Sequence, residues 1–173
     1  MFWTIGHSTR PIAELIALLE EHGVTRLLDV RTVPRSRHNP QYDTASLRQT
    51  LPPVGIGYAH RPELGGLRKP RGDSVNQGWK NESFRGYADY MQTPEFEQAL
   101  AALMTDAAAT PTAVMCAEAL PWRCHRSLIA DALSVRGVEV RHIMGPGKSQ
   151  VHALTAFAHV EGTRVTYPFS LEG

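Results

Sequence analysis

The sequence predicts an α/β fold, with one mostly parallel sheet covered by helices on both faces, and three observations lead to this prediction. Apolar runs of strand length alternate with amphipathic segments of helix length along the chain. The first two runs are joined by one helix through short connections, the pattern of a βαβ unit. With 173 residues, 42% of them hydrophobic, the chain has the size and composition of one ordinary domain. We therefore expect a single α/β domain over residues 1–173, in the three-layer, Rossmann-like arrangement.

The N-terminal part of the chain carries the first βαβ unit. Phe2–Gly6 is a short apolar run that predicts a strand. A helix follows, with Ser8 or Thr9 as its N-cap and Gly23 at its end. Thr25–Val30 is the second predicted strand, parallel to the first.

A long loop-rich insertion follows the second strand, from Arg31 to about Thr93. It is rich in Pro, Gly, Arg and Asn, and indicates only a short helix at Ala45–Leu51 and a candidate strand at Ile56–His60. Irregular stretches of this length inside a compact domain are usually functional. Its segment Arg61–Gly78 is a candidate to close over a bound ligand.

The second half of the chain returns to regular alternation of helix and strand. In chain order it predicts helices over Phe84–Met91 and Pro94–Asp106, a strand over Thr112–Cys116, a helix over His125–Arg136, a strand over Val138–Ile143, a helix near Val151–His159 and a last strand near Arg164–Phe169.

Composition excludes several classes of protein. No apolar run approaches the roughly 18 residues of a membrane-spanning helix, and the N-terminus lacks the pattern of a secretory signal. We therefore expect a cytoplasmic protein with no membrane partner and with its two cysteines reduced. The net charge of +1 gives the whole molecule little attraction for nucleic acid, but 15 of the 18 basic residues are Arg, whose planar fork suits phosphate. The sequence leaves the oligomeric state open.

Polar residues follow several predicted strands, and ligands bind at the carboxyl ends of the strands in open parallel sheets. We take His7, Asp29, Cys116 and Glu118 as the catalytic candidates. His7 is either a general base or a side chain that bonds neighbouring backbone. Asp29 and Arg31 alternate on a strand and can form an ion pair, either catalytic or structural.

The segment Val114–Leu128, VMCAEALPWRCHRSL, concentrates reactive groups and admits three interpretations. The first is the Cys-x5-Arg phosphate loop of cysteine phosphatases. Here six residues separate Cys116 from Arg123, the loop has no glycine, and Glu118 would repel a phosphate. We therefore disfavour phosphatase-like or rhodanese-like chemistry.

The second interpretation is a metal site made by Cys116, Cys124 and His125, with His7 as a further ligand. Adjacent Cys124 and His125 cannot easily both turn to one metal from a helix, and spaced CxxC motifs are absent. We therefore expect no metal and no other cofactor.

The third and favoured interpretation makes Glu118 a general acid or base beside an anion pocket at a helix N-terminus. A thiol at that N-terminus would have a lowered pKa, but for both cysteines we favour packing or pocket shaping over nucleophilic attack. The ligand-binding candidates lie at strand ends or at this helix start, and they are Arg31, Arg35, Arg123, Cys124, His125 and Arg126.

Five stretches resemble the family of the domain of unknown function 488 (DUF488). They are TIGHSTR, LLDVRTVPRSRHNPQY, YAHRPELGG, FRGYADYM and, above all, MCAEALPWRCHR. The family often has an acidic residue before the proline of the last stretch, where this chain has Leu120. The resemblance implies a compact α/β domain without a named reaction. It also implies one shared site made by His7, Asp29, Arg31, Glu118, Cys124, His125 and Arg126.

The leading functional hypothesis is an enzyme or binding protein for a phosphate-containing ligand, a nucleotide or nucleic acid. Arginines of the site would bind phosphate oxygens, while Glu118 or Asp29 moves a proton or positions water. The first alternative is a non-catalytic nucleic-acid-binding module. The second is a thiol or metal site protein that uses Cys116, Cys124 and His125.

Overall fold

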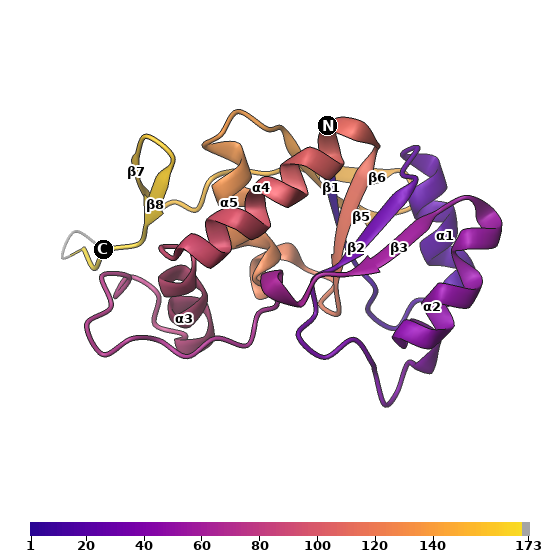
Figure 1. The fold of residues 1–173 in the computed structure, drawn as a ribbon, viewed down its shortest axis with the longest axis horizontal. Helices are drawn as coiled ribbons and strands as arrows, with labels where there is room; N and C mark the ends of the chain where they lie inside the picture. The colour runs from indigo at the N-terminus through magenta and orange to yellow at the C-terminus, as the bar shows by residue number, and fades with distance from the viewer. Residues whose placement is uncertain (171–173) are drawn as a thin grey trace.

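The computed structural model describes residues 1–170, and a six-stranded, mostly parallel sheet runs through these residues (Figure 1). Along the sheet the order is β3 (Gly57–His60), β2 (Arg26–Asp29), β4 (Thr112–Cys116), β1 (Phe2–Gly6), β5 (Val140–Gly145) and β6 (Lys148–Val151). The first five strands are parallel, and β6 is antiparallel to β5. Because β4 lies between β1 and β2, the carboxyl ends of these three strands are neighbours.

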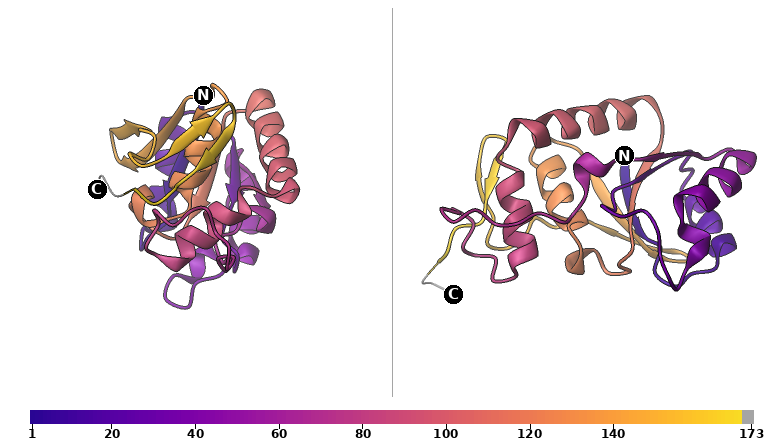
Figure 2. Two further views of the ribbon diagram at one scale, coloured as in Figure 1. Left: turned by 90° about the vertical axis from the view of Figure 1, so that its left-hand side faces the viewer. Right: turned by 60° about the horizontal axis from the view of Figure 1, so that its bottom comes forward.

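Helices lie on both sides of the sheet, which confirms the predicted α/β fold class (Figures 1 and 2). On one side are α1 (Ile12–Glu21) and α2 (Thr44–Thr50). On the other are α3 (Glu82–Tyr90), α4 (Pro94–Ala109) and α5 (Arg126–Ser134). None of the helices in the described residues is long and apolar enough to cross a membrane.

Alternation along the strands builds two hydrophobic cores. Leu28 of β2 and Val114 of β4 pack with α3, α4 and α5, while Leu27 and Met115 pack with α1 and α2. Successive side chains of a strand point to opposite faces, so each central strand contributes to both cores. This double burial explains why β4 is apolar from Ala113 to Cys116 and buried along its whole length.

The first helix begins later than predicted. Its N-cap is Pro11, with no side-chain capping bond, rather than Ser8 or Thr9. The reason is that the chain beyond β1 is still paired: the His7 and Ser8 N–H groups donate to the carbonyl oxygens of Cys116 and Ala117, each at 2.9 Å. Ser8 also has a positive φ of 48°, the geometry of a turn.

The predicted helix near Val151–His159 is wrong. Gly147 adopts φ +65° in the turn after β5, and the chain returns as the antiparallel strand β6. The residues beyond β6 are irregular up to β7 (His159–Glu161), which pairs with β8 (Arg164–Thr166) in a separate hairpin. The last predicted strand is therefore shorter and lies outside the main sheet.

The close approach of β1 to the loop after β4 predicts a large effect of Gly6→Ala. A Cβ atom at Gly6 would lie 1.7 Å from the carbonyl oxygen of Glu118, so backbone must move. We expect the free energy of unfolding, measured by urea denaturation, to fall by about 3 kcal/mol. Gly57→Ala is the control, since its nearest atom lies 3.7 Å away. Equal stability of the two variants would contradict this packing.

Candidate functional site

A pocket of about 410 Å³ opens at the carboxyl ends of β1, β2 and β4, and we call it the strand-end pocket. Four segments line it: His7 after β1; Arg31, Thr32, Val33, Arg35 and Ser36 after β2; Gly66, Leu67, Ser83 and Phe84 from the insertion; and Cys116, Ala117, Glu118, Arg123, Cys124 and His125 between β4 and α5. Eight of the sequence-predicted site residues are among them. The other two, Asp29 and Arg126, have fully buried side chains and do not line the pocket.

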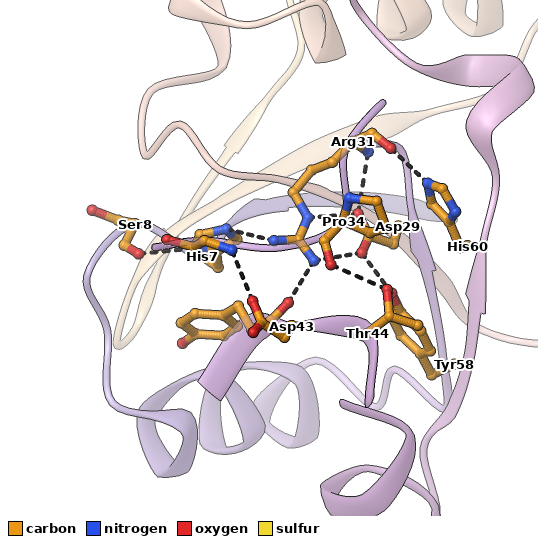
Figure 3. A network of polar contacts seen from close by, with 11 residues as sticks. His7, Ser8, Asp29, Arg31, Pro34, Asp43, Thr44, Tyr58 and His60 are labelled. Carbon is orange, nitrogen blue, oxygen red and sulfur yellow. Dashed lines mark hydrogen bonds and ion pairs between the residues drawn. The ribbon is translucent and has the colours of Figure 1, made fainter. Parts of the chain in front are cut away.

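Asp29 and Arg31 form a buried ion pair beside the pocket (Figure 3). Arg31 Nε and Nη2 donate to the two Asp29 carboxylate oxygens at 2.9 and 2.7 Å. The Tyr58 hydroxyl donates to the same carboxylate at 2.6 Å, and burial together with this bond raises the pKa of Tyr58 to about 12. Arg31 is thus neutralised by Asp29, and the Asp29 carboxylate is occupied by protein donors.

His7 is held as a neutral side chain by contacts at both ring nitrogens (Figure 3). Because Arg31 Nη1 can only donate, His7 Nε2 accepts at 3.3 Å, and Nδ1 therefore donates to the Ser8 carbonyl oxygen at 2.8 Å. The ring stacks on Tyr42 with centroids 4.2 Å apart. Burial lowers the pKa of His7, and the positive charge of Arg31 acts in the same direction. The ring nitrogen that a general base would use therefore faces a cation.

Arg126, at the first position of α5, is fully buried behind the loop that follows β4. Its Nη1 donates to Thr4 Oγ1 at 3.0 Å, and its Nη2 donates to the carbonyl oxygens of Glu118 at 2.7 Å and Ala119 at 3.3 Å. These acceptors are all neutral, and Nε has no hydrogen-bond partner. Arg126 therefore holds the loop in place but brings an uncompensated positive charge behind the pocket.

A chain of buried hydrogen bonds continues from Arg126 to Asp131. Thr4 Oγ1 lies 2.6 Å from His142 Nδ1, His142 Nε2 lies 2.8 Å from His152 Nδ1, and His152 Nε2 lies 2.7 Å from Asp131 Oδ1. Since Arg126 only donates and the carboxylate only accepts, every bond donates in the direction of Asp131, and both imidazoles carry their proton on Nε2. Every ring nitrogen of the two histidines is satisfied.

The two thiols lie next to each other on the pocket wall. Cys116 ends β4, Cys124 precedes α5, and the two thiols interact electrostatically. Burial raises the pKa of Cys116 well above its ordinary value. Burial also opposes ionisation of Cys124, but the interaction with Cys116 and the positive charge of Arg126 outweigh it and lower the pKa of Cys124 to about 7. The pocket therefore contains one acidic thiol and one thiol that burial keeps protonated.

His125 links the thiols to β2. Its Nε2 lies 2.9 Å from the Val30 carbonyl oxygen and so carries the proton, which leaves the Nδ1 lone pair facing Cys124 Sγ at 3.4 Å. Burial lowers the pKa of His125, so the ring is neutral near pH 7. Tyr87 of α3 packs against the ring, with centroids 5.0 Å apart.

The charged groups at the mouth of the strand-end pocket differ from the buried charged groups in exposure and in bonding. Arg35, Arg123 and Glu118 are exposed, and no hydrogen bond or ion pair of their side chains is recorded within residues 1–170. They are available to a ligand, whereas Arg31 and Arg126 are already bonded to protein. Glu118 is the only carboxylate among the lining residues.

Sequence reasoning missed two parts of this region. The apolar wall of the pocket, made by Val33, Leu67 and Phe84, comes from the insertion, whose loops follow no periodic pattern. The buried pairing of Thr4 with His142 was also missed, although polar residues inside otherwise apolar strands are a sequence signal for such a pair. They are register partners on β1 and β5. In the described part of the chain, no three His, Cys, Asp or Glu side chains gather as a metal site would require.

Comparison with known proteins supports the resemblance seen in the sequence. The family model described as "Domain of unknown function DUF488" matches residues 11–133, more than two thirds of the chain. Searches of curated proteins and of solved structures gave no match.

The hydrogen-bonded chain behind the pocket predicts a pH dependence of stability. Burial lowers the pKa of His142 to about 3, and His152 and Arg126 add to this effect against the charge of Asp131. Below an ordinary histidine pKa near 6.5 the unfolded chain binds a proton that the folded state does not. His142 therefore removes up to about 1.4 kcal/mol of unfolding free energy per pH unit as the pH falls. The loss begins as the pH falls through about 6.5 and stops at about 3.

Urea denaturation of His142→Asn between about pH 7 and pH 5 should therefore give a shallower dependence than the wild type. The exposed His38 provides the matched control, and His38→Asn should keep the wild-type slope. Identical slopes for the wild type and His142→Asn would show that His142 is protonated in the folded state.

Proposed function

The chain belongs to the DUF488 family, whose function is unknown, and from the strand-end pocket we propose that it binds a phosphate-containing ligand, with a nucleotide as the favoured class. The observation that carries this proposal is a pair of exposed arginines, Arg35 and Arg123, which line the same pocket and whose side chains have no partner among residues 1–170. Guanidinium groups bind phosphate oxygens in bidentate fashion, so two of them suit one phosphoryl group.

The size and the walls of the strand-end pocket favour a nucleotide over a bare anion. About 410 Å³ lies within the range of small-molecule sites. Val33 and Leu67 are exposed, at 50% and 72%, and Phe84 lies beside them in the lining. A base or another flat apolar group can bury these side chains while its phosphate contacts the arginines.

Glu118 is the residue to which we assign proton transfer or water positioning in a catalysed reaction. It is the one carboxylate that lines the strand-end pocket, and its carbonyl group is fixed by Arg126 while its side chain stays free. Asp29 is assigned a positioning role, because its oxygens are bonded to Arg31 and Tyr58. His7 likewise supports Arg31 rather than a reacting group.

Binding should depend on the two mouth arginines. We expect Arg123→Ala and Arg35→Ala each to weaken nucleotide binding by about tenfold or more, since a hydrogen bond to a charged group contributes about 1.5–3 kcal/mol. Calorimetric titration with nucleoside monophosphates, triphosphates and inorganic phosphate measures this effect and identifies the preferred class. Arg48→Ala, exposed on α2, is the matched control and should bind as the wild type does. Unchanged affinity of both mouth variants would refute the proposal.

Two further measurements separate catalysis from binding. Glu118→Gln should keep the affinity for the nucleotide and lose turnover, because the amide keeps the shape of the side chain but neither holds nor releases a proton. A non-catalytic nucleic-acid-binding module would instead bind oligonucleotides in preference to nucleotides. Its affinity would fall steeply between about 50 and 200 mM salt as several phosphate contacts are lost.

A further inference from the structure

We propose that Cys124 is a thiolate nucleophile and that Cys116 is its resolving thiol, so that a hydroperoxide converts the pair into a Cys116–Cys124 disulfide. Both residues line the strand-end pocket as free cysteines, both belong to the same buried cluster, and their thiols influence each other's ionisation. The proposal does not depend on the phosphate ligand, because it concerns the thiols alone.

The buried Arg126 provides the electrostatic argument. A guanidinium that is fully removed from water requires an anion nearby, since burying an unpaired charge costs several kcal/mol. Within residues 1–170 Arg126 forms no ion pair with a carboxylate, and its hydrogen-bond acceptors are a hydroxyl and two carbonyl groups. Arg126 lowers the pKa of the Cys124 thiol, which is therefore the ionisable group that supplies the missing negative charge.

The surroundings of Cys124 favour the thiolate. Cys116 and the positive charge of Arg126 both lower the pKa of Cys124. Cys124 lies just before the start of α5, so the partial positive charge of the helix N-terminus acts in the same direction. Cys116 instead donates to the Glu118 carbonyl oxygen, 3.6 Å from its sulfur, and so remains protonated.

The other titratable groups around Cys124 are either neutral or directed away from it. His125 Nδ1 has a free lone pair 3.4 Å from the sulfur and accepts the proton of the neutral thiol. Tyr87, from α3, is fully buried, and burial raises its pKa, so it adds no charge near pH 7. His7 is neutral and bonded to Arg31, and the Glu118 side chain points to solvent. Arg126 therefore provides the main charge that acts on the Cys124 thiol.

The reaction balances with a hydroperoxide as the only co-reactant. The Cys124 thiolate attacks the terminal oxygen of ROOH, an S–O bond forms while the O–O bond breaks, and the departing RO⁻ takes a proton from water to give ROH. Cys116 sulfur then attacks Cys124 sulfur and loses its proton, which leaves with the hydroxide as water. The peroxide gains two electrons and the two thiols lose them. Because the Cys116 thiol lies next to Cys124, it can attack the oxidised sulfur directly.

Alkylation of the folded, full-length protein tests the first half of the proposal. At pH 7 iodoacetamide should modify Cys124 at least about tenfold faster than Cys116, because the larger thiolate fraction of Cys124 outweighs the lower nucleophilicity of a more acidic thiol. Mass spectrometry of peptides assigns each site. The fast phase should be absent in Cys124→Ser and present in Cys116→Ser. Equal, slow labelling of both cysteines in the wild type would overturn the proposal.

Hydrogen peroxide tests the second half. One equivalent should remove both thiols of the wild type and give an intrachain disulfide, seen as a mass loss of two hydrogens that dithiothreitol reverses. Cys116→Ser should instead stop at a sulfenic acid on Cys124, trapped by dimedone, and Cys124→Ser should react at the slow rate of a buried thiol. Peroxide consumption that is equal in the wild type and Cys124→Ser would overturn the proposal. Nucleotide titration of the reduced protein separately tests the phosphate pocket, so either proposal can fail alone.

Discussion

The burial of Arg126 is the constraint on which this region of the molecule depends. One guanidinium, completely removed from water, joins β1 through Thr4, the loop after β4 through two carbonyl oxygens, and the start of α5 to which it belongs. Its hydrogen bonds fix the backbone of Glu118 so tightly against β1 that only glycine fits at position 6. The same charge, together with Cys116, lowers the pKa of Cys124. A residue buried at this cost therefore determines the shape and the chemistry of the pocket together.

The hydrogen bonds of Arg126 continue as a chain that connects β1, β5 and the residue after β6 to Asp131 of α5. Thr4, His142 and His152 connect a cation to a carboxylate through neutral groups that each donate in one direction. Asp131 also accepts from the Tyr167 hydroxyl at 2.7 Å, which attaches the C-terminal segment after β8 to α5. Polar networks of this kind stabilise a fold only when every member is satisfied. The irregular chain beyond β6 is held here by side chains, since it has no regular backbone pairing until β7.

Much of the fold and many of the site residues could be predicted because they follow from local patterns. The first five strands were located from apolar runs, and parallel strands place their carboxyl ends together, which is why His7, Cys116 and Glu118 were found as one group. The prediction of a helix over residues 151–159 was wrong because the structure there depends on a partner that is distant in the sequence. The apolar residues of this segment suit a helix, but a glycine turn and pairing with β5 place its first residue in a strand, and local periodicity does not register such a distant partner.

The sequence by itself determined the family, the order of strands and helices as far as β5, and the reactive groups that the strand ends carry to one edge of the sheet. Only the tertiary structure decided what each group can do there. Arg123 and Arg126 are three positions apart, yet one is exposed at the mouth and the other is sealed behind the loop. Cys116 and Cys124 are both buried, yet only Cys124 is made acidic. The physical reason is that ionisation depends on exclusion from solvent and on contacts that only the fold creates, such as those of Arg126 with Thr4 of β1 and of His125 with Val30 after β2.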